Sequence, residues 1–179
     1  MEYEVLTLPG LWNSGPQHWQ TLWEARHPAW RRVLHRDWNT PACAEWVAEL
    51  DAAIGQCERP PVLAAHSLSC ATIAHWAASG SRLKIAGAFL VAPSDTEGHN
   101  YPPEPTGFAP MPLQALPFPS IVVASADDIY VSMDRARRFA QAWGSRLVEL
   151  GPAGHINGAS GYGPWPEGER LLLEFCAGL

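Results

Sequence analysis

The chain has 179 residues, of which 47% are apolar and 17% are charged, and its formal net charge is −6. Such a composition is typical of a globular fold and argues against a disordered chain. The acidic balance argues against a nucleic-acid partner, and no apolar run approaches the roughly 18–20 residues of a membrane helix. This length predicts one domain over residues 1–179, and an N-terminus unlike a signal peptide leads us to expect a cytoplasmic protein.

The cysteine spacing predicts neither a metal site nor a disulfide framework. The four cysteines are Cys43, Cys57, Cys70 and Cys176, and no two of them form the CxxC pair that is typical of zinc sites. The histidines outside the site described below have no ligand-like partners at helical spacing. We therefore expect free, buried thiols, no metal ion and no cofactor.

Short apolar runs alternate along the chain with longer segments of helical periodicity. The predicted strands are 5–8, 32–35, 61–65, 85–91, 121–124 and 146–150. Several are apolar at consecutive positions, as in strands buried on both faces of a parallel sheet. The predicted helices are 44–54, 69–79, 132–143 and 167–177. This alternation predicts an α/β fold, a three-layer α/β/α sandwich with a mostly parallel sheet of about six strands.

The predicted helices have recognisable faces and ends. Segment 44–54 places four apolar side chains on one face, namely Trp46, Val47, Leu50 and Ile54. Segment 132–143 begins with Ser132, a favourable N-cap residue, and ends at Gly144, a favourable C-terminal residue. These signals predict helix boundaries as well as the helices themselves.

Residues 93–119 interrupt the alternation because they are rich in proline, which is unfavourable inside helices and strands. We predict a long loop here. Loops at this place in α/β enzymes often face the substrate, although a plain surface excursion fits the sequence equally well.

A serine stands where the predicted strand 61–65 runs into the next predicted helix. This arrangement is typical of a nucleophile elbow, in which the backbone N–H after the serine faces the substrate carbonyl. Ser67 is therefore a candidate nucleophile, and the Leu68 N–H is a candidate oxyanion donor. The tight turn needs small neighbours, and Ala65 and Ser69 stand where the motif usually has glycines. A purely structural N-cap is the alternative role for the serine.

A serine hydroxyl needs a base, and the base needs an acid that orients it. His155 lies in the loop after the last predicted strand, beside Gly154, which lets the backbone turn the imidazole inward. Asp127 and Asp128 follow the preceding strand, and Asp95 follows an earlier one. All three aspartates are candidate acids at this point. The order Ser, Asp, His is that of α/β hydrolases, whose sites lie at the carboxyl ends of parallel strands.

The loop after the first predicted strand is a candidate for the second half of an oxyanion hole. Gly10 permits close approach of the backbone, and the N–H of Leu11 follows it. A glycine-containing turn without a catalytic role is the alternative. The loop has neither the GxGxxG spacing nor the Lys-Ser/Thr ending of a phosphate-binding loop.

The segments LPGLWNSGPQHWQ, RDW, HSLS, VAPSD, SADDIYVS and GPAGHIN resemble, in this order, the small α/β-hydrolase family typified by retinoblastoma-binding protein nine and its bacterial relatives. The resemblance covers essentially the whole chain. It implies a compact α/β-hydrolase fold with little or no lid and a triad of Ser67 as nucleophile, His155 as base and Asp128 as acid. The chain departs from the family at the elbow glycines and at Ile129, where the family more often has proline.

Members of this family are described as serine hydrolases or esterases. The resemblance therefore implies a serine hydrolase, and an apolar pocket with few charges leads us to expect cleavage of a small carboxylic ester or amide through an acyl-enzyme. We expect a monomer or homodimer with no membrane partner. We expect the substrate pocket to be walled by Trp12, Tyr101, Phe108 and Ile156. Two alternatives stay open, a non-catalytic binding protein with a degenerate elbow and a different enzyme on the same fold, such as an acyl transferase or lyase.

Overall fold

Six parallel strands form one sheet at the centre of the molecule. The structure, a computed structural model, describes residues 3–179. The strands lie in the order β2-β1-β3-β4-β5-β6, and every neighbouring pair is parallel. Their bounds are β1 Val5–Leu8, β2 Trp30–Arg32, β3 Val62–His66, β4 Gly87–Val91, β5 Ser120–Ala124 and β6 Arg146–Glu149. The predicted parallel sheet is confirmed.

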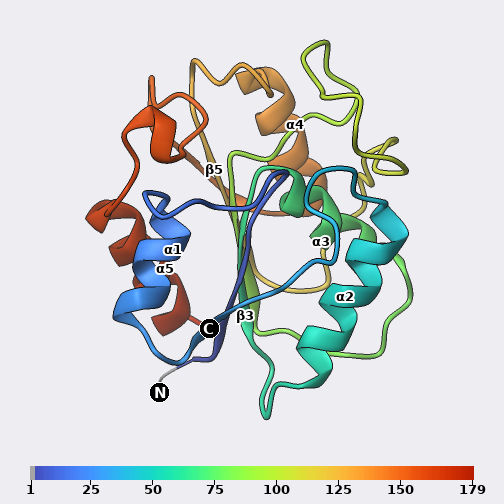
Figure 1. Ribbon diagram of the computed structural model, residues 1–179, viewed down its shortest axis with the longest axis vertical. Coiled ribbons are helices and arrows are strands. Elements are labelled where there is room, and N and C mark those ends of the chain that lie inside the picture. Colours follow the sequence, from blue (N-terminus) through green and yellow to red (C-terminus); the bar gives the residue numbers. More distant parts are fainter. Residues whose placement is uncertain (1–2) are drawn as a thin grey trace.

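Helices cover both faces of this sheet (Figure 1). On one face lie α1 (Trp19–Arg26) and α5 (Pro166–Ala177). On the other face lie α2 (Cys43–Gly55), α3 (Leu68–Ala78) and α4 (Met133–Trp143). A short 3-10 turn, η1 (Gly158–Ser160), precedes α5. The predicted three-layer α/β/α sandwich is therefore confirmed.

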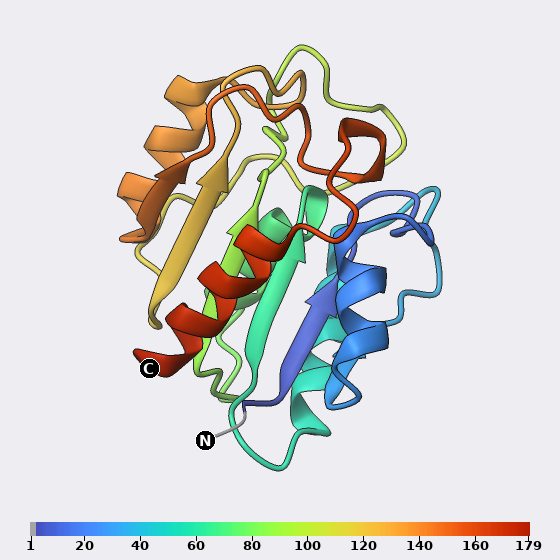
Figure 2. The same ribbon diagram turned by 90° about the vertical axis from the view of Figure 1, so that its left-hand side faces the viewer.

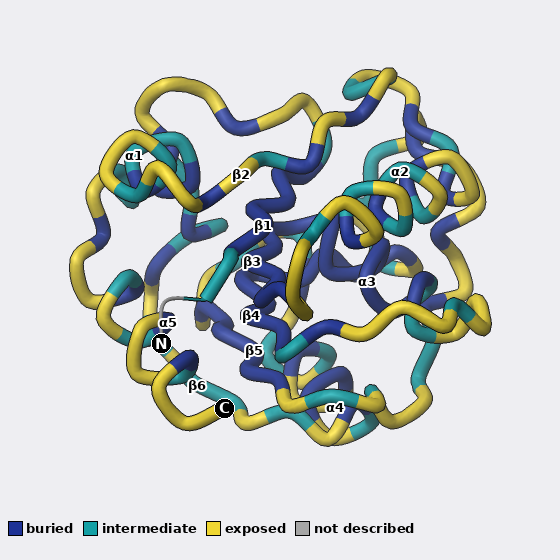
Figure 3. The backbone as a smooth tube through the Cα atoms, turned by 90° about the horizontal axis from the view of Figure 1, so that it is seen from below, coloured by how far each residue is buried: buried dark blue, intermediate teal, exposed yellow. Residues whose placement is uncertain are grey.

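The central strands are buried on both faces, as Figure 3 shows. In β1, Leu6 and Leu8 belong to the apolar cluster beneath α2, α3 and α4, whereas Val5 belongs to the cluster beneath α1 and α5. In β3, Leu63 likewise belongs to the first of these clusters and Val62 to the second. Successive side chains of a strand point to opposite faces. A strand between two helical layers therefore needs an apolar residue at every position, which explains the unbroken apolar runs.

α1 lies outside the predicted helices because its own sequence signal is weak. Its N-cap is His18, whose Nδ1 accepts a hydrogen bond from the Gln20 N–H at 3.2 Å, in place of the usual Ser, Thr, Asp or Asn. The indole N–H groups of Trp19 and Trp23 donate to the carbonyls of Ile156 and Pro164, each at 2.9 Å. Contacts with a segment far along the chain therefore stabilise this helix.

β2 is displaced from the predicted strand 32–35 and ends at Arg32. Only Trp30 of its residues is buried, because the strand lies at the edge of the sheet. Arg31 and Arg32 form ion pairs with Glu4 and Glu24 respectively. Because two of the three residues of β2 are charged, the strand does not form an apolar run, and a search for such runs cannot locate it.

The predicted helix ends agree with the structure to within a residue or so. The Ser132 hydroxyl accepts from the Arg135 N–H at 3.2 Å and so caps α4, and Gly144 ends it with a left-handed φ of 70°. The four cysteines are free thiols, and all are buried except Cys57, which is half-buried. Among residues 3–179, no helix has both the length and the apolarity that crossing a membrane requires.

Because every strand is parallel, all the carboxyl ends meet at one edge of the sheet (Figure 2). The loop between β4 and β5 lies above this edge. It contains no helix or strand within the described residues apart from a single bridge between Thr106 and Ala42, as predicted for the proline-rich segment 93–119. The loops after β1, β3, β4, β5 and β6 can thus bring side chains together here.

Candidate active site

Ser67 alone forms the turn between β3, which ends at His66, and α3, which begins at Leu68. Its φ is 58° and its ψ is −123°, a strained conformation for a non-glycine residue that costs about 1–3 kcal/mol. A backbone hydrogen bond stabilises this conformation, since the Ser67 N–H donates to the Val91 carbonyl at 3.0 Å. The side chain makes no capping hydrogen bond to α3. The hydroxyl is therefore not used as a helix cap.

The neighbours of Ser67 fit the tight turn although they are not glycines. Ala65 and Ser69 are fully buried, and the Ser69 hydroxyl donates to the Pro9 carbonyl at 2.6 Å. This hydrogen bond ties the start of α3 to the loop after β1. At Gly10 a Cβ atom would lie 2.8 Å from the Ser67 Cβ and 3.0 Å from the carbonyl oxygen that precedes it. The loop after β1 thus packs directly against the elbow, and glycine is needed there.

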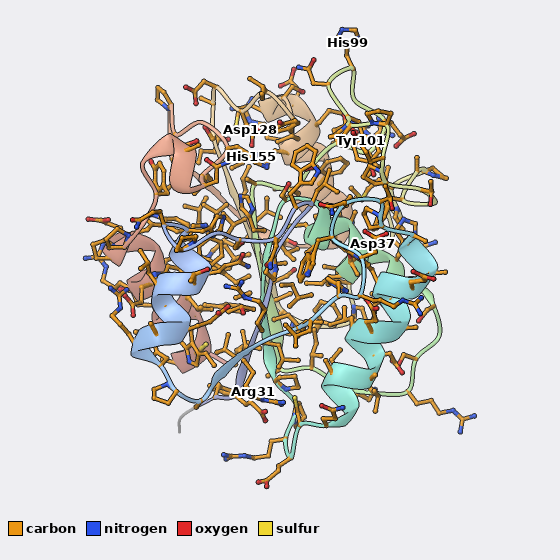
Figure 4. All side chains as sticks on the ribbon, in the orientation of Figure 1. Arg31, Asp37, His99, Tyr101, Asp128 and His155 are labelled. Atoms are coloured by element: carbon orange, nitrogen blue, oxygen red, sulfur yellow. The ribbon has the colours of Figure 1, made fainter. Side chains whose placement is uncertain are left out.

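His155 approaches Ser67 from the loop after β6. Its neighbours Gly154 and Ile156 have positive φ angles of 55° and 47°, so the backbone turns sharply at this point. The His155 Nε2 lies 2.8 Å from the Ser67 Oγ, and its Nδ1 lies 3.0 and 2.8 Å from the two carboxylate oxygens of Asp128. The Asp128 side chain has no exposed surface, and Figure 4 shows it beside His155 at the carboxyl edge of the sheet. The three side chains form one continuous hydrogen-bonded chain.

The two other candidate acids are engaged elsewhere. Asp127 accepts from the Ser125 hydroxyl at 2.8 Å and from two backbone amides of the His155 loop at 2.8 and 2.7 Å. These hydrogen bonds, that of Ser125 first, hold the pKa of Asp127 below its usual range. Asp95 pairs with Arg135 of α4 through both carboxylate oxygens, each at 2.8 Å. Neither aspartate orients the imidazole.

The backbone N–H groups of Leu68 and Leu11 are the predicted candidates for oxyanion donors. Leu68 is the first residue of α3, so its amide stands at the positive end of the helix dipole. Leu11 follows Gly10, where a Cβ atom would be only 3.3 Å from the Leu68 nitrogen. Within residues 3–179, neither amide donates a hydrogen bond to another protein group. Paired, unpartnered donors of this kind are what oxyanion stabilisation requires.

A cavity of about 200 Å³ opens beside Ser67. It is lined by the predicted residues Trp12 and Tyr101, and Figure 4 shows Tyr101 across the edge of the sheet from His155. Among the described residues that line it, none is Asp, Glu, Lys or Arg. The long loop after β4 contributes to the wall, which favours the substrate-facing interpretation of that loop. Within residues 3–179, no three His, Cys, Asp or Glu side chains are grouped as metal ligands.

Phe108 and Ile156 do not line this cavity, so their prediction as pocket residues is wrong. Phe108 is buried in the core cluster beneath α2 and α3, with its ring 5.8 Å from that of Trp46. Ile156 is fully buried in the opposite cluster, beside α1. Both lie close to site residues in sequence, but their side chains point into the core, where an apolar side chain is more stable than at a wet surface.

The cavity lining includes several residues outside the predicted set, among them His18, Ser94 and Tyr130. The Ser94 Oγ lies 2.8 Å from the Ser67 Oγ, and the Tyr130 ring centroid lies 4.7 Å from that of His155. Ser94 stands just after a strand end, the same signal that selects Asp95, so the sequence did contain a clue to it. No local sequence pattern predicts that His18 lies at the site, where the loop after β1 places it.

His18 and His66 form a buried group with His155. The ring centroids of His18 and His66 are 4.7 Å apart, and those of His66 and His155 are 4.8 Å apart. Burial first, and then the nearby charges of Arg32 and His155, together lower the pKa of His18 to about 3. Burial also lowers the pKa of His66 well below its ordinary value. The His66 Nε2–H donates to the His155 carbonyl at 2.8 Å and so anchors the loop of the imidazole.

We expect the protein to lose stability as the pH falls below the ordinary histidine pKa of 6.5. Folded His18 stays neutral down to about pH 3, whereas the unfolded chain takes up a proton at that residue near pH 6.5. The unfolded state therefore binds more protons between these values. The free energy of unfolding should fall by up to about 1.4 kcal/mol per pH unit for each such histidine. Urea unfolding at several pH values across this window measures the slope.

The matched variant for this measurement is His18→Asn, because asparagine also caps a helix but does not titrate. The variant should show a shallower fall in unfolding free energy with acid. If the unfolding free energy fell with pH at the same slope in both proteins, His18 would not be a cause of the acid sensitivity.

Solved structures with the same fold include hydrolases from several bacteria. A Pectobacterium atrosepticum protein described as a YdeN-like hydrolase is 35% identical with a TM-score of 0.84, over 96% of this chain and 89% of that one. The ydeN gene product of B. subtilis is 20% identical with a TM-score of 0.75, over 98% and 100%. A Thermogutta terrifontis esterase with bound butyrate is 20% identical with a TM-score of 0.69, over 97% and 81%. Among curated proteins, none matches the sequence.

The architecture is that of the α/β hydrolases, in which a serine follows a central parallel strand at a sharp turn. Residues 5–174 match the serine hydrolase family, and the chain belongs to it. The resemblance found in the sequence motifs is thus confirmed, and membership of this family supports a hydrolase activity.

Proposed function

We propose that this protein is an esterase that cleaves a small, neutral carboxylic ester through a Ser67 acyl-enzyme. The observation that carries the proposal is the hydrogen-bonded chain from Asp128 through His155 to Ser67, with contacts of 2.8–3.0 Å. A serine hydroxyl becomes a nucleophile when a base within hydrogen-bond reach takes its proton. The geometry supports Ser67 as nucleophile, His155 as base and Asp128 as the acid that orients the imidazole.

In the proposed acylation, the Ser67 Oγ attacks the ester carbonyl carbon while its proton passes to the His155 Nε2. Asp128 holds the proton on Nδ1 and stabilises the imidazolium that forms. The amides of Leu11 and Leu68 bind the oxyanion, and the loss of one such donor costs about 10²–10³ in rate. His155 then protonates the leaving alcohol, and water activated by the same imidazole releases the acid.

The cavity supports a small, uncharged substrate. Its volume is about 200 Å³, and its described lining includes no ionic side chain other than histidine. A carboxylate or phosphate on the substrate would therefore find no cation to pair with, and burying it unpaired is unfavourable. Trp12, at the mouth, is 54% exposed and offers an aromatic surface to an acyl or alcohol group. The butyrate bound to the Thermogutta terrifontis esterase suggests a short acyl chain as the first class to test.

The proposed nucleophile can be tested with a fluorophosphonate probe, which reacts with activated serines. The native protein should be labelled and Ser67→Ala should not. Ser79→Ala, at the far end of α3, is the matched control and should label like the native protein. Equal labelling of native protein and Ser67→Ala would eliminate Ser67 as the reactive group.

The substrate class can be tested with p-nitrophenyl esters of increasing acyl length. We expect turnover to be fastest with short chains and to decline as the acyl group outgrows the cavity. A protein that labels with the probe yet hydrolyses no short ester would show that ester cleavage is the wrong reaction. A protein that does neither would support the alternative of a non-catalytic binding protein, against which the close Ser67–His155 contact argues.

A further inference from the structure

We infer that Ser94 is a further catalytic residue, which donates a hydrogen bond to the Ser67 Oγ and stabilises that oxygen as it leaves during deacylation. The inference rests on the proposed esterase function. Ser94 follows β4, and its Oγ lies 2.8 Å from the Ser67 Oγ. The two serines are 5% and 9% exposed, so little water competes for this contact.

The direction of the hydrogen bond between the two serines follows from the contacts of His155. Both oxygens of the Asp128 carboxylate face the His155 Nδ1, so the imidazole proton lies on Nδ1 and Nε2 is an acceptor. Ser67 must then give its single proton to the hydrogen bond with Nε2. Its oxygen can only accept in the remaining contact, and the Ser94 hydroxyl is therefore the donor.

The position of Ser94 is held rigidly from both sides. Its N–H approaches the Ser67 carbonyl at 3.4 Å. The next residue, Asp95, donates its N–H to the Tyr130 carbonyl at 3.0 Å and pairs through its carboxylate with Arg135 of α4. A donor fixed in this way needs no reorganisation when charge develops near it, which is the condition for effective electrostatic catalysis.

Deacylation is the step in which this donor is most useful. Water attacks the acyl carbon and gives a proton to the His155 Nε2. The tetrahedral intermediate then collapses as the bond between carbon and the Ser67 Oγ breaks. The bonding electron pair goes to Oγ, which takes the proton back from Nε2, and the carboxylic acid departs. Negative charge builds on Oγ as the bond breaks, and a hydrogen bond to a charged oxygen is stronger than one to a neutral ester oxygen.

Acylation benefits less from the same hydrogen bond. Before attack, the Ser94 hydroxyl already stabilises the neutral Ser67 Oγ, and this stabilisation is partly lost as Oγ bonds to carbon. An interaction accelerates a step only when it is stronger in the transition state than in the ground state. The loss of Ser94 should therefore slow the breakdown of the acyl-enzyme more than its formation.

The test is to measure hydrolysis of p-nitrophenyl acetate by Ser94→Ala, with both stopped-flow and steady-state kinetics. We expect kcat to fall by about 10- to 100-fold, as for loss of a hydrogen bond to a charged group. We expect kcat/KM, which reports acylation, to fall only a few-fold. A burst of p-nitrophenol should persist, and the variant should accumulate acetylated at Ser67, as mass spectrometry would detect.

An equal fall in kcat and kcat/KM would overturn the inference, because it would mean that Ser94 merely positions Ser67. Unchanged kcat would overturn it as well. Native protein with no turnover and no fluorophosphonate labelling would instead refute the proposed function itself, so the two failures are distinguishable.

Two further variants separate the hydroxyl from packing. Ser94→Thr keeps the donor and should recover most of kcat, whereas a folded threonine variant as slow as alanine would assign the effect to shape. Ser120→Ala is the matched control, because the Ser120 Oγ makes a similar, partly buried contact with the Ser145 Oγ at 2.6 Å, at the start of β5 and away from the site. It should leave both kinetic constants unchanged, and thermal melting confirms that each variant is folded.

Discussion

Replacement of His155 by alanine is expected to lower kcat for an ester substrate by about 10⁶-fold while the protein stays folded. Removal of the base from a serine triad costs about as much as removal of the whole triad, because the members act as a unit. Without the imidazole, the Ser67 Oγ keeps its proton, and Asp128 is too far along the chain of contacts to remove it. The small residual rate should come from the oxyanion donors and from substrate binding.

Steady-state kinetics and a thermal melt of His155→Ala together check this result. The His155 carbonyl, which anchors the loop to His66, remains in the alanine variant. His99→Ala is the control, since His99 lies at the tip of the loop after β4 and points away from the molecule in Figure 4. Near-native turnover of His155→Ala would refute the proposed base. A large fall in melting temperature together with lost activity would point to a structural role.

Replacement of Gly10 by alanine is expected to lower kcat by about 10²–10³-fold, the cost of one lost oxyanion donor. The added Cβ would lie 2.8 Å from the Ser67 Cβ and 3.0 Å from the His66 carbonyl oxygen, and neither is the end of a flexible side chain. The loop after β1 would have to move away from the elbow and take the Leu11 amide with it. Overpacking of this kind also costs about 1–3 kcal/mol of stability.

Gly15→Ala is the matched control for this prediction. It changes a glycine of the same loop at which a Cβ atom would meet nothing within 4 Å. It should retain native kcat and stability. The measurement is kcat for a p-nitrophenyl ester alongside urea unfolding. Native kcat in a folded Gly10→Ala variant would mean that the loop after β1 supplies no donor to the oxyanion.

Much of the fold and part of the site could be predicted from the sequence because their signals are local. A strand between two helical layers is apolar at every position, and residues 62–65 read that way before any contact is known. Ser132 and Gly144 mark the ends of α4 by backbone preferences of their own. Ser67 was found from the junction of a strand and a helix, which is also a feature of consecutive residues.

Other features depend on which side chains from distant segments meet, and only the tertiary structure decided them. Adjacent aspartates have the same chemistry, but the backbone directs Asp128 to His155 and Asp127 to the amides of the loop. α1 is stabilised by hydrogen bonds from its tryptophans to carbonyls more than a hundred residues away.

The sequence by itself determined every strand of the sheet except β2, the turn at Ser67 and the supply of an acid and a base after the right strands. The tertiary structure decided the partners, including the Ser94 hydroxyl that contacts Ser67. It also placed Phe108 and Ile156 in the core rather than in the cavity. The physical reason is that periodicity and turn preferences are properties of neighbouring residues. The direction of a side chain depends on how every layer packs, and no local pattern encodes that.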